Sequence, residues 1–284
     1  MVAVVTSTAT CTAFRALDET TGEVGPTRVL VERVGFLAAL AQAMTMSVVA
    51  ARWNDGDLCR VGRGVGPDGR ALPTKGWMAL RRLGWHAAAP EGVYASDRVR
   101  RVTGEAAARV LRLAVHRRAV VRAILASWPA DPRQRTDAEW AALRQRLPQG
   151  SSNAEVRNRT RQVRAWQADH AGRLPACLTE LEAAPRTPGV VLLAAADKQL
   201  VTIEGVGPDG AVLHLQLPLT ERPASRSQWA WHAIQFRLPG HVPADANLCV
   251  PTLRVTGGWT YPGAVRARTC SGPGTRPRWA WIGG

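Results

Sequence analysis

The sequence predicts an α+β protein, a split β-barrel whose strands are interrupted by an arginine-rich helical segment. Apolar and polar residues alternate with the period of strands near the N-terminus and again from Val190. Between these regions the apolar residues recur at helical spacing. Two separate domains would leave the first strands without partners, which is rarely stable. One core formed by strands on both sides of a helical insertion is therefore expected.

The predicted insertion divides the chain into four parts. Residues 1–34 hold the first barrel strands, Val2–Leu17 and Arg28–Val34, and residues 35–188 form the helical insertion. Residues 189–256 supply the remaining strands. Residues 257–284 contain no acid and no sustained period, so a disordered tail and a frameshifted end both remain open.

The first part of the insertion is predicted to contain an uncharged helix followed by a loop. The uncharged run Val34–Ala51 predicts a buried helix in preference to a membrane span, because it is short for a span and contains Gln42 and Thr45. The glycine-rich residues 52–90 predict a loop. Gly-Pro-Asp-Gly occurs in this loop and again at Gly207–Gly210, and both copies are interpreted as turns. The second copy joins Val201–Glu204 to Leu213–Leu217 in the clearest hairpin of the chain.

The charge favours a polyanionic partner. The formal net charge is +15 with a pI near 11.2, and the residues from Ser96 to Arg173 contain 17 arginines against seven acids. Phosphate is the commonest partner of such a surface. An alternative is a protein-interaction module whose arginines meet an acidic protein.

Two predicted helices carry this charge. In Ser96–Trp128 the apolar residues, among them Val99, Val110, Leu113 and Ile124, are expected on one side and the basic residues on the other. Ser152 and Glu155 have capping-box spacing and start a second helix; Thr136 and Glu139 have the same spacing. The predicted nucleic-acid-binding residues are Arg98, Arg101, Arg109, Arg112, His116, Arg122, Arg157, Arg161 and Arg164.

Two further features have open interpretations. Arg117 falls on the apolar side of the first basic helix, which indicates either a buried ion pair or a second element crossing there. Trp229 and Trp231 fall on one face of a strand and either pack in the core, the favoured reading, or stack on bases.

No catalytic residue, metal ligand, cofactor or small-molecule site is predicted. The five cysteines form no CxxC pair, which argues against a zinc ribbon or a disulfide framework and for a reducing, cytoplasmic location. Asp197 stands alone, whereas a nuclease needs several carboxylates converging on metal ions. A site assembled from distant residues, such as a divergent metal-dependent nuclease, remains open as a third alternative.

Several stretches resemble the N-terminal half of TnpB-like proteins, the OrfB-type insertion-sequence transposases. They are YASDRVRRVTGEAAARVLRLAVHRRAVV (94–121), RTDAEWAAL (135–143), EVRNRTRQVRAWQADH (155–170), LAAADKQLVTIEGVGPDGAVLHLQLPL (193–219) and PADANLCVPTLRV (243–255). The resemblance implies an oligonucleotide-binding, wedge-like barrel interrupted by a recognition lobe that holds RNA or an RNA–DNA duplex. The family's catalytic acids and zinc ribbon have no counterpart here, so the resemblance implies a truncated relative without its own cleavage site.

Overall fold

The computed structural model describes residues 9–19, 22, 24–25, 27–187, 190–192, 201–205, 210–237, 247–248, 252–256, 264–270 and 278–281. The chain divides into two compact units. The sheet unit comprises Met1–Ser47, His86–Ala106 and Thr187–Gly284, and the helical unit comprises Val48–Trp85 and Ala107–Arg186. The mixed α+β class predicted from the sequence is confirmed.

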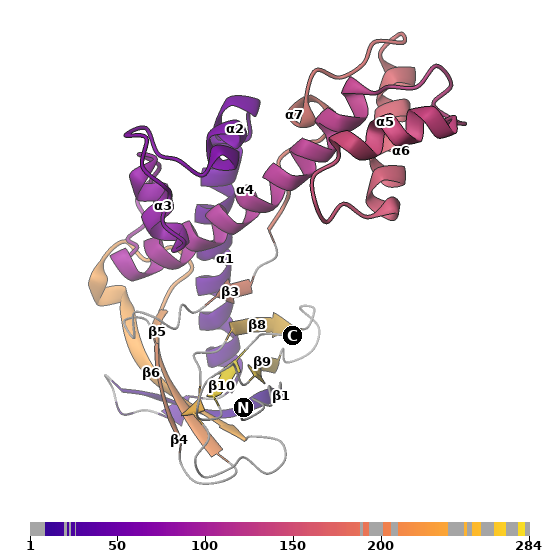
Figure 1. Cartoon of the computed structure of the whole chain (residues 1–284). Coiled ribbons are helices and arrows are strands. Elements are labelled where there is room, and N and C mark those ends of the chain that lie inside the picture. The colour runs from indigo at the N-terminus through magenta and orange to yellow at the C-terminus, as the bar shows by residue number, and fades with distance from the viewer. Residues whose placement is uncertain are drawn as a thin grey trace. The chain divides into compact units, whose positions relative to one another are not determined.

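The helices occupy the middle of the chain and strands flank them (Figure 1). The helices are α1 (Thr27–Ala51), α2 (Asp55–Arg63), α3 (Gly76–Arg82), α4 (Asp97–Ala126), α5 (Asp137–Arg146), α6 (Asn153–Asp169) and α7 (Leu178–Leu181). The strands are β1 (Ala9–Asp18), β2 (Val24–Gly25), β3 (Val190–Leu192), β4 (Val201–Gly205), β5 (Gly210–Pro218), β6 (Trp229–Arg237), β7 (Asn247–Leu248), β8 (Thr252–Thr256), β9 (Ala264–Cys270) and β10 (Arg278–Trp281).

The main sheet joins strands from both ends of the chain. Its order is β3-β8-β9-β1-β6-β5-β4, so β1 lies between a C-terminal strand and the hairpin strands. The predicted hairpin is confirmed, since β4 and β5 pair antiparallel from Val201↔Leu215 to Gly205↔Ala211. Among the described strands β3 and β4 end the path without pairing to each other, so no closed barrel is seen there.

Helix α1 has a buried apolar stripe, and one of its charged residues contacts the sheet. Leu30, Val34 and Leu37 are at most 2% exposed, and their i, i+4, i+7 spacing continues the helix through residues 28–34. The predicted strand Arg28–Val34 is therefore wrong, because the helical stripe of α1 already begins at Leu30. From the same helix Arg33 donates to Asp18 of β1 at 3.1 Å and contacts His232 of β6.

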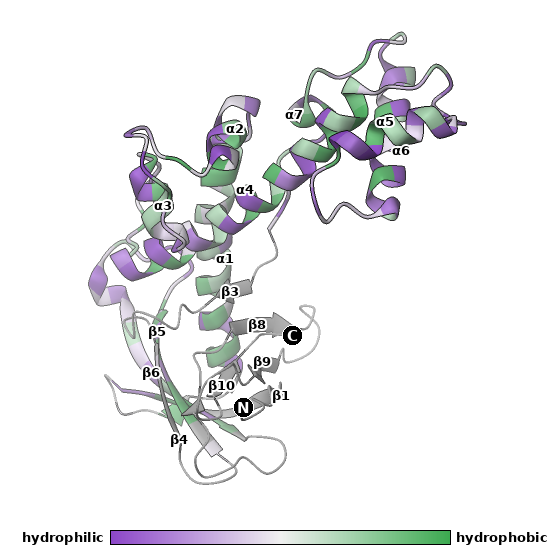
Figure 2. Cartoon of the chain, in the orientation of Figure 1, coloured by the Kyte–Doolittle hydropathy of each residue, from purple (hydrophilic) through white to green (hydrophobic). Residues whose placement is uncertain are grey.

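Helix α1 also has the length and composition of a membrane span. Residues Arg28–Ala51 have a mean hydropathy of 1.8 over their most apolar window, half of which is buried within the protein. Figure 2 shows this apolar character along α1. Core helices of soluble proteins share these properties, and the contacts of α1 with the sheet agree with the predicted buried helix.

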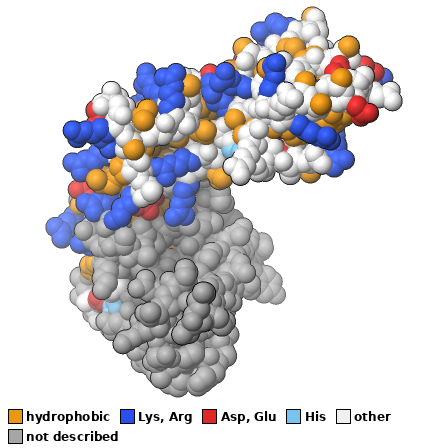
Figure 3. Space-filling view, viewed as in Figure 1, with side chains coloured by type: hydrophobic (Ala, Val, Ile, Leu, Met, Phe, Trp, Pro, Cys, Tyr) orange, Lys and Arg blue, Asp and Glu red, His pale blue; other side chains and the backbone are white. Residues whose placement is uncertain are grey.

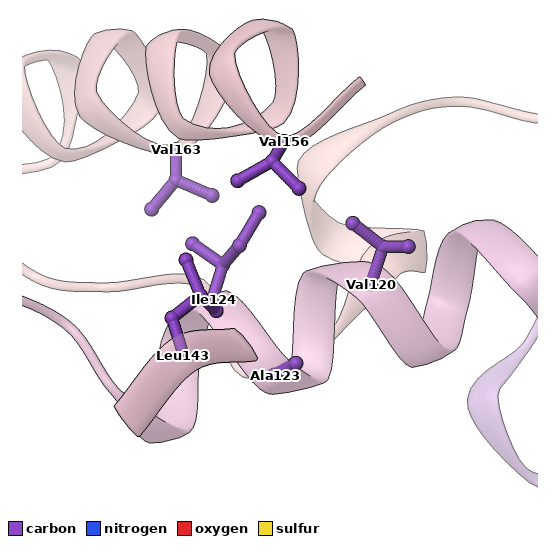
Figure 4. Close-up of a cluster of buried hydrophobic side chains, with 6 residues drawn as sticks. All are labelled: Val120, Ala123, Ile124, Leu143, Val156 and Val163. Atoms are coloured by element: carbon purple, nitrogen blue, oxygen red, sulfur yellow. The ribbon is translucent and has the colours of Figure 1, made fainter. Parts of the chain in front are cut away.

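The helical unit has its own core where α4, α5 and α6 meet. Val120, Ala123 and Ile124 of α4 pack with Leu143 of α5 and with α6 (Figure 4). The residues from α6 are Val156 and Val163, which are 1% and 0% exposed. Trp128, Trp140 and Leu174 are among the partly buried residues that border the cluster. The two valines, seven positions apart, form the buried stripe of α6.

Residues 52–90 are not a loop, because the structure places α2 and α3 there. Asn54 caps α2, accepting a hydrogen bond from the Asp57 amide at 2.8 Å, and Gly64 ends the helix at φ +64. These capping signals lie among seven glycines that suggested irregular structure. The first Gly-Pro-Asp-Gly is a turn, as predicted: Gly69 has φ +72, and its amide donates to Gly66 at 3.0 Å.

The C-terminal residues also differ from expectation. Strands β9 and β10 lie within residues 257–284, and β9 pairs with β1 and β8. Arginine alternates with alanine and threonine in β9, and this pattern lacks the apolar face by which strands are usually recognised. The strand comes from pairing with distant segments.

Candidate nucleic-acid interface

Helix α4 begins and ends as predicted, and its predicted apolar stripe is buried near both ends. The Val99 amide donates to the Ser96 hydroxyl at 3.5 Å, which caps the first turn. Val99 and Ile124 of the predicted stripe are 2% and 0% exposed. In the middle of the helix the predicted apolar residue Leu113 is instead 69% exposed. The residues buried there are Ala107, Ala108, Leu111 and Ala114.

The predicted basic side of α4 spans a wide arc. At about 100° per residue Arg109, Arg112 and His116 lie within about 60° of one another around the helix axis. Arg122 is exposed and lies at the edge of this side, about 80° from Arg112 and about 140° from Arg109.

Arg112 connects α4 to the segment before α3. Its guanidinium donates to the backbone carbonyls of Pro73 at 2.7 Å and Thr74 at 3.0 Å. These bonds hold the segment that precedes the exposed Lys75 against the exposed Arg112, and Arg109 is exposed one turn before Arg112 on the same helix. We call Lys75, Arg109 and Arg112 the α4 surface. The sequence does not indicate a role for Lys75, because the predicted loop 52–90 carries no sign of its contact with α4.

His116 is engaged within the helical unit. Its Nε2 lies 3.3 Å from the Glu155 carboxylate at the start of α6, and its side chain is 37% exposed. An imidazole beside a carboxylate is a poor phosphate ligand, so we leave His116 out of the α4 surface.

A second basic surface lies on α6. Arg157, Arg161 and Arg164 are all exposed and fall within about 60° of arc. No residue three or four positions from any of them is an acid, so none has the helical ion pair that commonly neutralises a surface arginine. We call these three residues the α6 surface.

The contacts of α6 with its neighbours use the side of the helix away from the α6 surface. Glu155 contacts His116 of α4, and Arg159 donates to Glu182 at 2.5 Å. The α6 surface lies about 140 to 200° around the axis from Arg159. The α6 surface therefore lies away from the contacts that join α6 to α4 and to Glu182.

The remaining predicted residues, Arg98 and Arg101, belong to the sheet unit and are half-buried. Arg98 lies over the ring of Trp231 with its guanidinium carbon 6.0 Å from the ring centroid. Trp229 is 7% exposed, which confirms core packing for that tryptophan.

Arg117 has the ion pair considered from the sequence, and a second element crosses there as well. Its guanidinium donates to Glu182, just after α7, at 3.1 Å. The predicted ion pair and the predicted crossing element are thus both present, because the partner of Arg117 belongs to the segment that crosses α4.

The helical unit carries most of the net charge. Its two segments contain 22 Lys and Arg against 10 Asp and Glu, a net of +12 out of +15 for the chain. In Figure 3 blue basic side chains are spread over the described surface and red acidic ones are fewer. The excess cannot be balanced within the unit, because its acids are outnumbered about two to one.

Many of the acidic residues of the helical unit form ion pairs within it. Arg118 donates to both oxygens of Asp55 at 2.5 and 2.6 Å, and this bonding holds the pKa of Asp55 below its ordinary value. Arg82 pairs with Asp68 at 2.9 Å. Other internal pairs are Arg52 and Arg60 with Asp57, Arg173 with Glu180, and Arg117 and Arg159 with Glu182. None of these pairs uses a residue of the α4 or α6 surface.

The described residues contain no group of three or more His, Cys, Asp or Glu arranged to hold a metal ion. Cys59 and Cys177 are free thiols, and the predicted lone candidate Asp197 lies outside the described residues. Comparisons with protein-family models, curated proteins and solved structures find no match. The TnpB-like resemblance therefore stays a prediction.

Proposed function

We propose that this protein binds nucleic acid, as RNA or an RNA–DNA duplex, through contacts between arginines of its helical unit and backbone phosphates. The observation that carries the proposal is the set of exposed basic residues, on the α4 and α6 surfaces, that no described acid pairs with. Guanidinium groups suit this role because they stay charged and can donate two parallel hydrogen bonds to a phosphate.

The alternative of an ordinary solvated basic surface is less favourable. Such faces mix charges of both signs and form pairs one turn apart. Here acids pair with Arg117, Arg118 and Arg159, which stabilise the unit, while Arg157, Arg161 and Arg164 have none nearby on their helix. Uncompensated charge of one sign costs stability by self-repulsion. A polyanionic partner would relieve that repulsion.

The TnpB-like resemblance extends this proposal. On it, the helical unit corresponds to a recognition lobe and the flanking strands to a split, oligonucleotide-binding barrel, in a truncated transposase relative that does not cleave. Strands from both ends of the chain share one sheet, which is compatible with such a barrel. Its closure would require a pairing beyond those of the described strands.

Removing charge from the α4 surface tests the proposal. The variant Lys75→Gln/Arg109→Gln leaves Arg112 in place, since Arg112 holds backbone carbonyls and its loss would disturb the fold. Binding of a short RNA–DNA duplex of generic sequence is measured over a range of salt concentrations. We expect the slope of log K against log salt to fall by about two units, with affinity about fivefold lower for each lost contact near 0.15 M salt.

The matched control is Arg60→Gln/Arg173→Gln, which removes the same charge from residues that already pair with Asp57 and Glu180. Its slope should change less. Equal slopes for the two variants would show that binding follows net charge alone and would contradict the assigned surface. Tighter binding to polyglutamate than to the duplex would favour the acidic-protein alternative and reject the proposal.

A further inference from the structure

Leu113 is a large apolar side chain on the basic side of α4. It is more exposed than any other large hydrophobic residue in the described part of the chain. Around the helix axis it lies about 40° from Arg109 and about 60° from His116. Other residues of α4 form the core at this level of the helix, so the exposed Leu113 contributes little to the fold. Its side chain is therefore available to whatever binds the neighbouring arginines.

The α4 and α6 surfaces turn the same way. His116 lies on the face of α4 that carries Arg109 and Arg112, and it contacts Glu155 of α6. Glu155 is about 160° around α6 from Arg157. The α6 surface therefore lies on the side of α6 that faces away from α4, in the direction in which the α4 surface also faces. One ligand can meet both surfaces.

A step separates the two surfaces. Helix α6 packs on α4 from the contact of His116 with Glu155 to the buried Val120 and Ile124 (Figure 4). Packed helices have axes about 8 to 10 Å apart, so the α6 surface stands about that much farther out than the α4 surface. Leu113 precedes His116 by three residues, about 4.5 Å along the axis. Leu113 therefore lies at the foot of the step, between the two surfaces.

A duplex that contacts both surfaces has to bend away from α4 at this step. Duplexes are stiff, with a persistence length of about 50 nm, and a sharp bend is concentrated in a kink where stacking is weak. Proteins that bind the minor groove produce such kinks by inserting an apolar side chain, such as leucine, between base steps. The duplex then bends toward its major groove, away from the inserted side chain. This is the direction that the step requires.

From this arrangement, and resting on the proposed function, we infer that Leu113 inserts between two base pairs of an RNA–DNA duplex and kinks it. The α4 and α6 surfaces hold phosphates on either side of the kink. An RNA–DNA duplex has A-form geometry, whose wide, shallow minor groove admits a leucine side chain. The insertion forms no hydrogen bond to a base, so it favours weakly stacked positions without reading a sequence.

The test uses the full chain and two short RNA–DNA duplexes of the same generic sequence, one fully paired and one with a single-nucleotide bulge. Both carry 2-aminopurine, a base whose fluorescence rises when it is unstacked, at the site of the bulge. Because the bulge already weakens stacking, we expect the unmodified chain to bind the bulged duplex about tenfold more tightly. Fluorescence should rise when the chain binds either duplex.

Two substitutions at Leu113 separate insertion of an apolar side chain from other roles. Leu113→Gln places a polar side chain of similar length there and should lose most of the preference for the bulge and most of the fluorescence rise. Leu113→Met keeps an apolar side chain and should retain both. The slope of log K against log salt should be the same for all three proteins, because no phosphate contact has changed. Circular dichroism confirms that each variant is folded.

The outcomes distinguish the two proposals. If the unmodified chain binds neither duplex, the proposed function fails and this inference fails with it. If it binds both duplexes equally, or if Leu113→Gln keeps the full preference, the proposed function stands and the insertion of Leu113 is rejected. The insertion is also rejected if sedimentation of the free chain shows an oligomer that Leu113→Gln dissociates, because a second copy of the chain would then cover Leu113.

Discussion

The guanidinium of Arg117 donates to the carboxylate of Glu182 at 3.1 Å, across 65 residues of chain. Arg159 donates to the other carboxylate oxygen at 2.5 Å. The backbone carbonyl of Glu182 also accepts from the Trp53 indole at 2.9 Å. One residue after α7 thus joins α4, α6 and the segment before α2, which makes Glu182 a central contact of the helical unit.

Replacement of Glu182 should destabilise this unit. Glu182→Gln leaves two half-buried guanidinium groups facing a neutral amide, and we expect a loss of about 2 kcal/mol in the free energy of unfolding. Urea denaturation followed by tryptophan fluorescence measures the change. Glu221→Gln, at an exposed glutamate, is the control and should have little effect. Equal stability of the two variants would mean that the Glu182 contacts contribute nothing.

The buried face of α4 can be checked with two truncations in the same helix. Ile124 is 0% exposed in the core of the helical unit, and Ile124→Ala should cost about 3 kcal/mol through lost contacts and a cavity. Leu113 is 69% exposed, so Leu113→Ala should change stability by less than about 0.5 kcal/mol. Thermal unfolding measures both. A large effect at Leu113 would restore the face predicted from the sequence and overturn the observed one.

The stability of the sheet unit should fall as the pH drops below neutral. Burial lowers the pKa of His232 below its ordinary 6.5, and the positive charge of Arg33 lowers it further. The hydrogen bond to Ala230 and the negative charges of Asp18 and Glu19 oppose this shift in part. In His232, Nδ1 donates to the Ala230 carbonyl at 3.0 Å and Nε2 accepts from Arg33. Because an accepting Nε2 carries no proton, these partners correspond to the neutral imidazole. Between the lowered pKa and 6.5 the unfolded chain binds more protons, and stability therefore rises with pH over that window.

Denaturation between about pH 7.5 and pH 5.5 tests this dependence. Part of the loss at lower pH should disappear in His232→Gln and persist in His86→Gln, whose histidine is exposed in the same unit. If both variants keep the full pH dependence, another group is responsible.

Local chemistry carried by the sequence proved reliable in several places. The Thr136 and Glu139 capping box starts α5, with the Thr136 amide donating to Glu139 at 2.8 Å. The alternation around Gly207–Gly210 predicted the β4–β5 hairpin, and the valines of α6 predicted its buried stripe. These features depend on residues within one turn or one hairpin, so neighbours in sequence suffice to specify them.

The sequence by itself thus determined the α+β class, a helical middle between two regions of strands, and the concentration of positive charge in the middle of the chain. Tertiary structure decided which charges remain available. Arg118 and Arg159 look like Arg109 and Arg161 in the sequence, but distant carboxylates at Asp55 and Glu182 pair with the first two. It also decided that Leu113 is exposed and that Arg157, Arg161 and Arg164 lie away from the contacts of α6, because contacts between segments far apart in sequence fix how each helix is turned.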